Sequence, residues 1–141
     1  MPENVPPVIY WDSSAVLSAL FEDSHSHTAT KWASKSTLHL ISTLAYTETS
    51  SVVSRMGREG VLKEEDLNSI LDTLDRGAWR HLNLSPDREI VRPLARKWSL
   101  RGADLWHLAA AKTLQTRLPE IYLLTFDGRL EAAARGEGLV T

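Results

Sequence analysis

Short runs of apolar, β-branched and aromatic residues alternate along this chain with longer segments whose apolar residues recur every three or four positions. The runs are VIYWD (8–12), LHLIS (38–42), WRHLNL (79–84) and IYLLTF (121–126), and GLVT (138–141) is predicted as a final edge strand. Strands that alternate with helices are typical of an α/β fold with a parallel sheet. The sequence therefore predicts a three-layer α/β/α sandwich around a mainly parallel, five-stranded sheet.

Helices are predicted between these runs from the spacing of their apolar residues. The expected helical ranges are 13–21, 25–35, 43–60, 64–74, one around 94–98, 103–115 and 130–135. Pro93 is expected to interrupt the first half of the helix around 94–98, because proline removes a backbone donor. The two helices between 43 and 74 are additional to a simple strand–helix alternation. No repeat or flexible linker divides the sequence, so we expect a single domain over residues 1–141.

Composition narrows the functional classes. The 141 residues include no cysteine, which excludes disulfides, thiolate catalysis and cysteine-based metal centres. Sixteen Lys and Arg against 18 Asp and Glu give a net charge of −2, so a polyanion would have to be bound by local basic residues. No apolar run approaches the length of a membrane span, and the N-terminus has no signal-peptide pattern. We therefore expect a soluble, cytoplasmic protein without a membrane partner.

Four acidic residues are predicted to meet at one edge of the sheet. Asp12 and Asp127 each end a predicted strand, and Asp104 lies in the first turn of the helix that follows Gly102. Glu48 lies about one turn into the helix that follows the second strand. In a parallel sheet with right-handed crossovers, strand C-termini and helix N-termini share one edge, which is also where open α/β folds bind ligands.

An acid at a strand end or in a first helical turn is often only a helix cap. Glu48 and Asp104, however, fall on apolar helix faces, where a carboxylate is costly unless a positive group meets it. No Lys or Arg within a few residues of either acid offers an obvious partner. A divalent cation would turn the mutual repulsion of four carboxylates into coordination, and ligands that are all oxygen suit Mg²⁺ or Mn²⁺.

Four motifs resemble, in order and spacing, the acidic motifs of PIN-domain ribonucleases, especially the VapC toxins of bacterial toxin–antitoxin pairs. They are YWDSSA (10–15), Glu48 early in its helix, RGADLWHLAAA (101–111) and LTFDGRL (124–130). The resemblance spans essentially the whole chain. It implies a PIN-like fold.

By this resemblance, Asp12, Glu48, Asp104 and Asp127 form the catalytic and metal-binding quartet. Ser14 and Thr125 match hydroxyl positions that the family uses beside the metal. The resemblance further implies an RNA substrate, a cognate antitoxin that covers the acidic edge, and a homodimer. The role of a toxin rests on the resemblance alone.

The sequence is consistent with hydrolysis of a phosphodiester by an activated water. Carboxylate-bound Mg²⁺ polarises a phosphoryl oxygen and lowers the pKa of bound water, so no protein nucleophile is needed. Indeed the chain has no GxSxG elbow and no phosphate-binding P-loop. Arg101 and Arg129 are candidate phosphate contacts. His107 is a candidate to orient an acid, to touch substrate or to pack beneath the site, whereas Asp23-x-His25-x-His27 lacks a third metal partner nearby.

The sequence does not fit two other functional classes. A phosphoryl-accepting receiver domain needs an aspartate at the end of the third strand, where this chain has Asn83-Leu84. A dehalogenase-like phosphatase needs a second aspartate at the position of Ser14. The remaining alternative is a catalytically silent PIN scaffold that binds RNA or a protein.

Overall fold

The computed structural model describes residues 5–140, which form eleven helices and strands in alternating groups. In chain order these are β1 (Val8–Trp11), α1 (Ser13–Leu20), α2 (Ser26–Ala33), β2 (His39–Ser42), α3 (Thr43–Arg58), α4 (Glu64–Arg76), β3 (Trp79–Leu82), α5 (Arg88–Lys97), α6 (Gly102–Gln115), β4 (Ile121–Leu124) and α7 (Gly128–Gly136). The predicted alternation is confirmed, and so is the additional pair α3–α4 between the second and third strands.

The strands form one parallel sheet in the order β3-β2-β1-β4. β1 is central and pairs with β2 through Ile9 and His39 and with β4 through Ile9 and Tyr122. All four residues of β1 are buried, as expected for a strand that is covered on both faces. The parallel sheet agrees with the prediction, although it has four strands rather than five.

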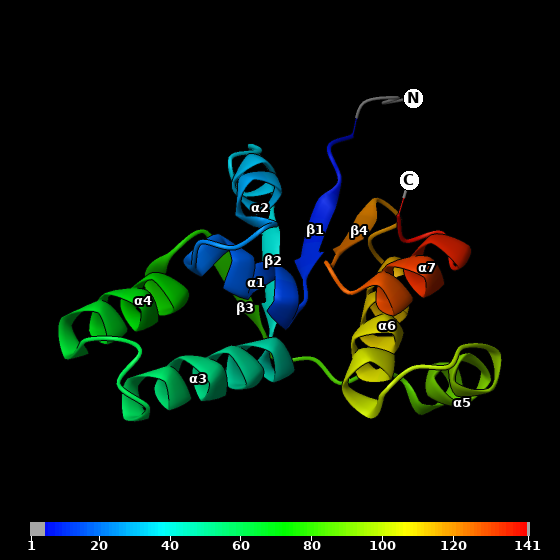
Figure 1. Ribbon diagram of the computed structural model, residues 1–141. Helices are drawn as coiled ribbons and strands as arrows, with labels where there is room; N and C mark the ends of the chain where they lie inside the picture. Colours follow the sequence, from blue (N-terminus) through cyan, green and yellow to red (C-terminus); the bar gives the residue numbers. More distant parts are fainter. Residues whose placement is uncertain (1–4, 141) are drawn as a thin grey trace.

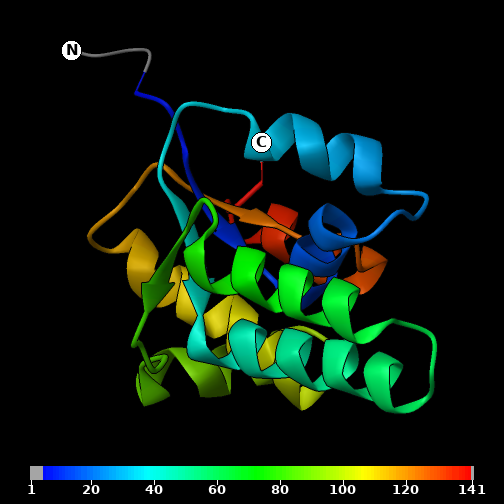
Figure 2. The same ribbon diagram turned by 90° about the vertical axis from the view of Figure 1, so that its left-hand side faces the viewer.

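Helices cover both faces of the sheet, and the pleat of β1 divides the core between them. Val8 and Tyr10 point into an apolar cluster with α5, α6 and α7. Ile9 and Trp11 point into a second cluster with α1, α2, the start of α3, and α4. Figure 1 shows these two helical layers on either side of the strands, and Figure 2 shows α3 and α4 lying side by side. The predicted three-layer sandwich is confirmed.

The predicted fifth strand at 138–141 does not form within the described residues. Gly138 has a positive φ of 77°, and the Leu139 N–H turns back to donate to Ala134 at the end of α7. Leu139 keeps a single sheet-like bond, in which its carbonyl accepts from Leu123 N–H at 2.9 Å. A residue whose N–H is engaged by a helix cannot extend a ladder, so β4 remains the last strand. Thr141 lies outside the described residues.

Pro93 does not interrupt its helix. α5 runs from Arg88 to Lys97 with Pro93 inside it. Leu94 is buried, and Ile90 and Val91 pack against the same apolar cluster as α6, which stabilises the helix despite the missing donor.

Within residues 5–140 no helix is both long and apolar enough to cross a lipid bilayer.

Candidate active site

The structure places the four predicted acids at the C-terminal edge of the sheet. Asp12 directly follows β1, where it is the N-cap of α1, and Asp127 stands between β4 and α7 as the N-cap of α7. Asp104 lies in the first turn of α6, and Glu48 lies in the second turn of α3. The parallel topology brings these elements together from four separate parts of the sequence.

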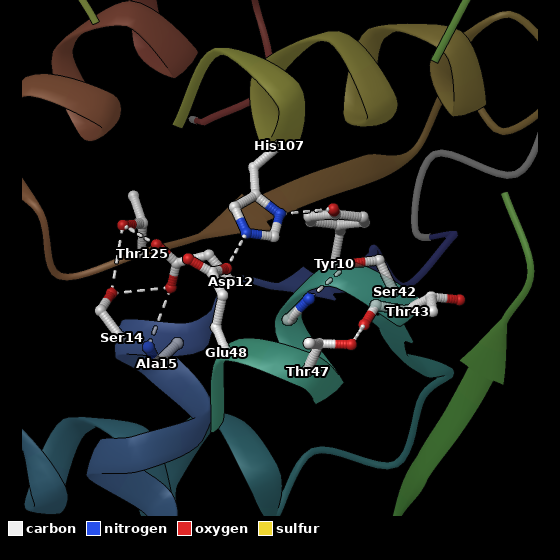
Figure 3. A network of polar contacts seen from close by, with 11 residues as sticks. Tyr10, Asp12, Ser14, Ala15, Ser42, Thr43, Thr47, Glu48, His107 and Thr125 are labelled. Carbon is white, nitrogen blue, oxygen red and sulfur yellow. Dashed lines mark hydrogen bonds and ion pairs between the residues drawn. The ribbon is translucent and has the colours of Figure 1, made fainter. Parts of the chain in front are cut away.

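Asp12 is buried, at 3% exposure, and both of its carboxylate oxygens accept hydrogen bonds. Oδ1 accepts from the Ser14 hydroxyl at 2.7 Å and from the Ala15 backbone N–H at 2.9 Å. Oδ2 accepts from the Thr125 hydroxyl. Figure 3 shows these three donors surrounding the carboxylate. Hydrogen bonds from three sides fix the orientation of this side chain.

The two hydroxyls are themselves oriented by backbone donors. Ser14 Oγ accepts from Phe126 N–H and Thr125 Oγ1 accepts from Asp127 N–H, each at 3.0 Å. Because a hydroxyl has one hydrogen, the N–H donors leave that hydrogen to be donated to Asp12. Ser14 and Thr125 therefore connect the backbone that follows β4 to the carboxylate of Asp12, which follows β1.

Glu48 meets a buried histidine. His107 Nε2 lies 2.8 Å from Glu48 Oε1, and its Nδ1 lies 2.7 Å from the Tyr10 hydroxyl oxygen (Figure 3). Burial raises the pKa of the Tyr10 phenol, so the phenol keeps its proton and can donate it to Nδ1. The imidazole is thereby left with its proton on Nε2, which donates to Glu48.

This contact shows how the fold accommodates Glu48, whose side chain is 31% exposed, while that of His107 is 1% exposed. His107 is therefore placed beneath the site, oriented toward an acid, rather than on a surface that substrate could reach. The acid that it orients is Glu48 on α3 and not Asp104 on its own helix. The sequence contained no signal for this pairing, because the two residues are 59 positions apart.

Asp104 has a different environment. Burial raises its pKa first, and the negative charges of Asp127, Asp12 and Glu48 raise it further, against a lowering by His107. Its carboxylate forms no hydrogen bond or ion pair with any other residue of the 5–140 range. The pKa of Asp12 is also raised by burial, although its three donors oppose that effect. The four acids therefore lie close enough to repel one another.

The donor set fits a hard divalent cation, because it consists of carboxylate oxygens that repel one another. In the described part of the chain, no three histidine or acidic side chains converge tightly enough, as they stand, to hold a metal ion. Besides Asp12, two more of the acids are held by protein donors: Glu48 by His107, and Asp127 Oδ1 by the N–H groups of Arg129 and Leu130. The chemistry of the ligands, rather than a preassembled cage, supports the predicted site.

A pocket of about 450 Å³ opens beside these acids. Asp104 and Asp127 line it together with the two predicted phosphate contacts, Arg101 and Arg129. Both arginines are exposed, and each stands at the beginning of a helix that carries one of the acids. The pocket therefore offers positive charge to a phosphate next to the carboxylates.

The Asp23-x-His25-x-His27 segment does not form a metal site within the described structure. Asp23 accepts from the His25 N–H and from the Ser18 hydroxyl, which closes the turn between α1 and α2. The His25 ring stacks on Phe126, with ring centroids 4.6 Å apart. The segment lies at the largely exposed start of α2.

Comparison with known proteins identifies the relatives of this chain. Residues 9–136 match the model of the PIN domain. Ribonuclease VapC45 of Mycobacterium tuberculosis strain CDC 1551 is 32% identical over 135 residues, which cover 94% of this chain and 92% of the relative. Ribonuclease VapC49 of strain H37Rv matches to the same extent.

Solved structures share the fold at lower identity. Mycobacterium tuberculosis VapC20, described as a sarcin-ricin loop cleaving toxin, gives a TM-score of 0.61 at 16% identity, covering 89% of this chain and 94% of that chain. FitAcB from Neisseria gonorrhoeae gives 0.63 at 18% identity, with 91% and 94% covered. The family match over most of the chain, the relatives at 32% identity and the shared architecture together lead to one conclusion: this chain belongs to the PIN-domain family, among the VapC-like ribonucleases.

Proposed function

We propose that this protein is a divalent-metal-dependent endoribonuclease and the toxin of a toxin–antitoxin pair. The observation that carries the proposal is the convergence of four carboxylates beside a pocket with two exposed arginines. The names of the relatives support it, because VapC45 and VapC49 are ribonucleases and VapC20 is described as a sarcin-ricin loop cleaving toxin.

In the proposed site, Asp12, Glu48, Asp104 and Asp127 hold Mg²⁺ or Mn²⁺. The cation would polarise the phosphoryl oxygen and supply an activated water for attack on phosphorus. The side chains of the protein would position the metal ligands and the substrate.

The chain's buried groups orient two of the ligands. The hydroxyls of Ser14 and Thr125 hold Asp12, and the Nε2–H of His107 holds Glu48. At the surface, Arg101 and Arg129 are suited to bind the phosphate oxygens of RNA, since both line the pocket and both are charged at neutral pH. In this proposal the cation and its bound water would carry out the chemistry, and the protein would position the metal ligands and the RNA.

Cleavage of a labelled RNA in Mg²⁺, in Mn²⁺ and in excess EDTA tests the proposal. Activity should appear with either cation and vanish in EDTA, since all the ligands are hard oxygens. Undiminished cleavage in EDTA would contradict the metal requirement. No cleavage under any of these conditions would instead support the silent scaffold.

The proposal also includes an antitoxin, a homodimer and a cytoplasmic location. The structure neighbour VapBC2 from Rickettsia felis, described as bound to a DNA fragment from their promoter, supports the antitoxin. An antitoxin that competes for the acidic edge should present Arg or Lys to the carboxylates. Reversing those charges should release ribonuclease activity, and light scattering of the isolated chain tests the homodimer.

A further inference from the structure

Three arginines form a ridge along one exposed face of α5. Arg88, Arg92 and Arg96 are spaced four residues apart, so that they follow one another at about 6 Å along the helix axis. All three are exposed, and within residues 5–140 none of their guanidinium groups forms a hydrogen bond or ion pair. We refer to these three residues as the arginine ridge.

Some exposed arginines on other helices have an acidic partner, although within residues 5–140 Arg58 on α3 and Arg129 on α7 form no ion pair. α3, α4 and α7 each match an arginine with an acid four residues away, in the pairs Arg55–Glu59, Arg76–Asp72 and Arg135–Glu131. On α5 the residue four positions from each arginine is another arginine. Like charges at this spacing destabilise a helix, whereas opposite charges stabilise it. Apart from Arg96, which lies in the last turn where a positive charge is favourable, the repeated like charges of the ridge do not stabilise α5.

The ridge borders a hollow that an extended anionic chain could occupy. The three arginines line a hollow of about 610 Å³ together with Glu89 and Pro93. Glu89 is the only acid among these lining residues, and it forms no ion pair with the arginines in the described structure. The surface thus keeps an excess of positive charge available to a ligand.

The ridge lies near the candidate active site. Leu94 on the opposite face of α5 is buried in the cluster that includes α6, the helix that carries Asp104. In both overall views α5 lies at the same end of the molecule as the start of α6 (Figures 1 and 2). The chain then continues from α5 to Arg101, which lines the acidic pocket. Arg101, at the acidic pocket, thus follows Arg96 of the ridge by five residues.

We propose that the arginine ridge of α5 binds the phosphate backbone of the RNA substrate outside the cleavage site. The proposal rests on the proposed function, and it assigns a second, non-catalytic contact surface to the same substrate. Arginine suits this role because its planar guanidinium forms paired hydrogen bonds with phosphate oxygens and keeps its charge at all physiological pH values. Contacts to phosphates fix position and affinity without reading bases.

The test measures RNA affinity of the full chain against salt concentration. Binding of a labelled single-stranded RNA in EDTA, where cleavage is prevented, is compared between the parent and the combined variant Arg88→Gln, Arg92→Gln and Arg96→Gln. Each phosphate contact contributes about 0.7 to the slope of log affinity against log salt, so the slope should become shallower by about 2. Glutamine preserves helix propensity, so the melting temperature should not fall.

A matched control removes the same charge elsewhere. The combination Arg76→Gln, Arg117→Gln and Arg135→Gln changes α4, the loop before β4 and α7, and it should leave the salt slope of the parent unchanged. A second variant that replaces the three ridge arginines by lysine should retain most of the slope, because the charges remain.

The outcomes separate the two proposals. If the parent cleaves RNA with Mg²⁺ but the ridge variant has the slope of the parent, the ridge proposal is wrong and the proposed function stands. If the parent neither binds nor cleaves RNA, both are wrong. If the ridge variant keeps the RNA slope but loses binding to a polyglutamate peptide, the ridge is a docking surface for an acidic protein. The expected result is a shallower slope, with a raised KM and an unchanged kcat.

Discussion

The four acids of the edge fall into two pairs that the fold treats differently. Asp12 and Glu48, the inner acids, are held by donors that are themselves oriented by the protein, namely two hydroxyls, a backbone N–H and a buried imidazole. Asp104 and Asp127, the outer acids, line the open pocket, and Asp104 has no partner within residues 5–140. Folding positions the inner pair within the protein. In the outer pair, Asp127 accepts hydrogen bonds from two N–H groups at the start of α7, so among the four acids only Asp104 has no donor within residues 5–140.

This contrast shows how one site can combine carboxylates that hydrogen bonds hold rigidly with a carboxylate that has no hydrogen-bond donor. Preorganised ligands lower the cost of ordering a cation, and unsatisfied carboxylates supply the attraction for it. In the proposed metal site, the inner acids would serve the first purpose and Asp104 the second. Substitutions in the two pairs should therefore affect folding and activity in different proportions.

The largest effect is expected for the outer acid Asp104. Asp104→Asn should lower RNA cleavage by more than about 100-fold, because losing a direct ligand should exceed the 10–100-fold cost of losing an outer-shell partner. The same change should leave the fold intact, since no protein donor depends on this side chain. RNA cleavage assays beside thermal melting in EDTA measure both effects.

Asp66→Asn is the matched control for this prediction, because Asp66 is the third residue of α4 as Asp104 is the third residue of α6. It should leave activity unchanged and shift stability by about 0.5 kcal/mol or less. An active Asp104→Asn enzyme would remove Asp104 from the site.

The next effect tests the inner acid Glu48 through its partner. His107→Leu should lower cleavage about 10–100-fold by freeing Glu48, and it should cost about 1–3 kcal/mol of stability, because the buried Tyr10 hydroxyl loses its acceptor. Metal affinity, measured by titration calorimetry, should fall as well. Tyr10→Phe should reduce activity less, since His107 still donates to Glu48. Equal metal affinity of His107→Leu and the parent would show that His107 only fills space.

A smaller effect is expected from one donor to Asp12. Thr125→Val keeps the shape of the side chain but removes its hydroxyl, which should cost about 1–3 kcal/mol of stability and a loss of activity of about tenfold. Thr47→Val is the control, because its hydroxyl donates to the Thr43 carbonyl on an exposed helix face. Urea unfolding of both variants measures the difference. If the two valine variants were equally stable, the inner acids would be no better held than surface groups.

The smallest effect concerns pH. The pKa of Asp104 is raised above its ordinary value of 3.8, so the folded state binds this proton more tightly than the unfolded state does. The charged carboxylate therefore destabilises the metal-free fold at neutral pH. Asp104→Asn should be more stable than the parent there, by up to about 1 kcal/mol. This difference should disappear as the pH falls through the interval between the raised value and 3.8. A difference that grows in acid would contradict the assigned repulsion.

Sequence patterns predicted the helices and strands that depend on residues close together in the sequence. The apolar run around Tyr10 and the small apolar residues Ala109–Ala111 are buried, Asp104 stands in the first turn of its helix as predicted, and Asp127 follows β4. Topology then brings the acids together, because strand ends and helix starts share an edge in any parallel sheet.

What the sequence did not reveal depends on contacts between distant positions. The contact of His107 with both Tyr10 and Glu48 joins three elements, and no spacing encodes it. The missing fifth strand has a similar cause, since Leu139 N–H is taken by Ala134 O in competition with the sheet. Pro93 stays in a helix because tertiary packing exceeds the cost of one missing hydrogen bond.

Two of the four acids have a second duty that bears on how related sequences should be interpreted. Asp12 and Asp127 cap α1 and α7, and each such cap is worth about 1 kcal/mol, whereas Asp104 and Glu48 cap nothing. A descendant that had lost ribonuclease activity would still be selected to keep these two aspartates for folding, and Glu48 as the partner of the buried His107, whereas Asp104 would drift. Retention of Asp104, rather than of all four acids, is therefore the diagnostic that separates a working nuclease from an inherited scaffold.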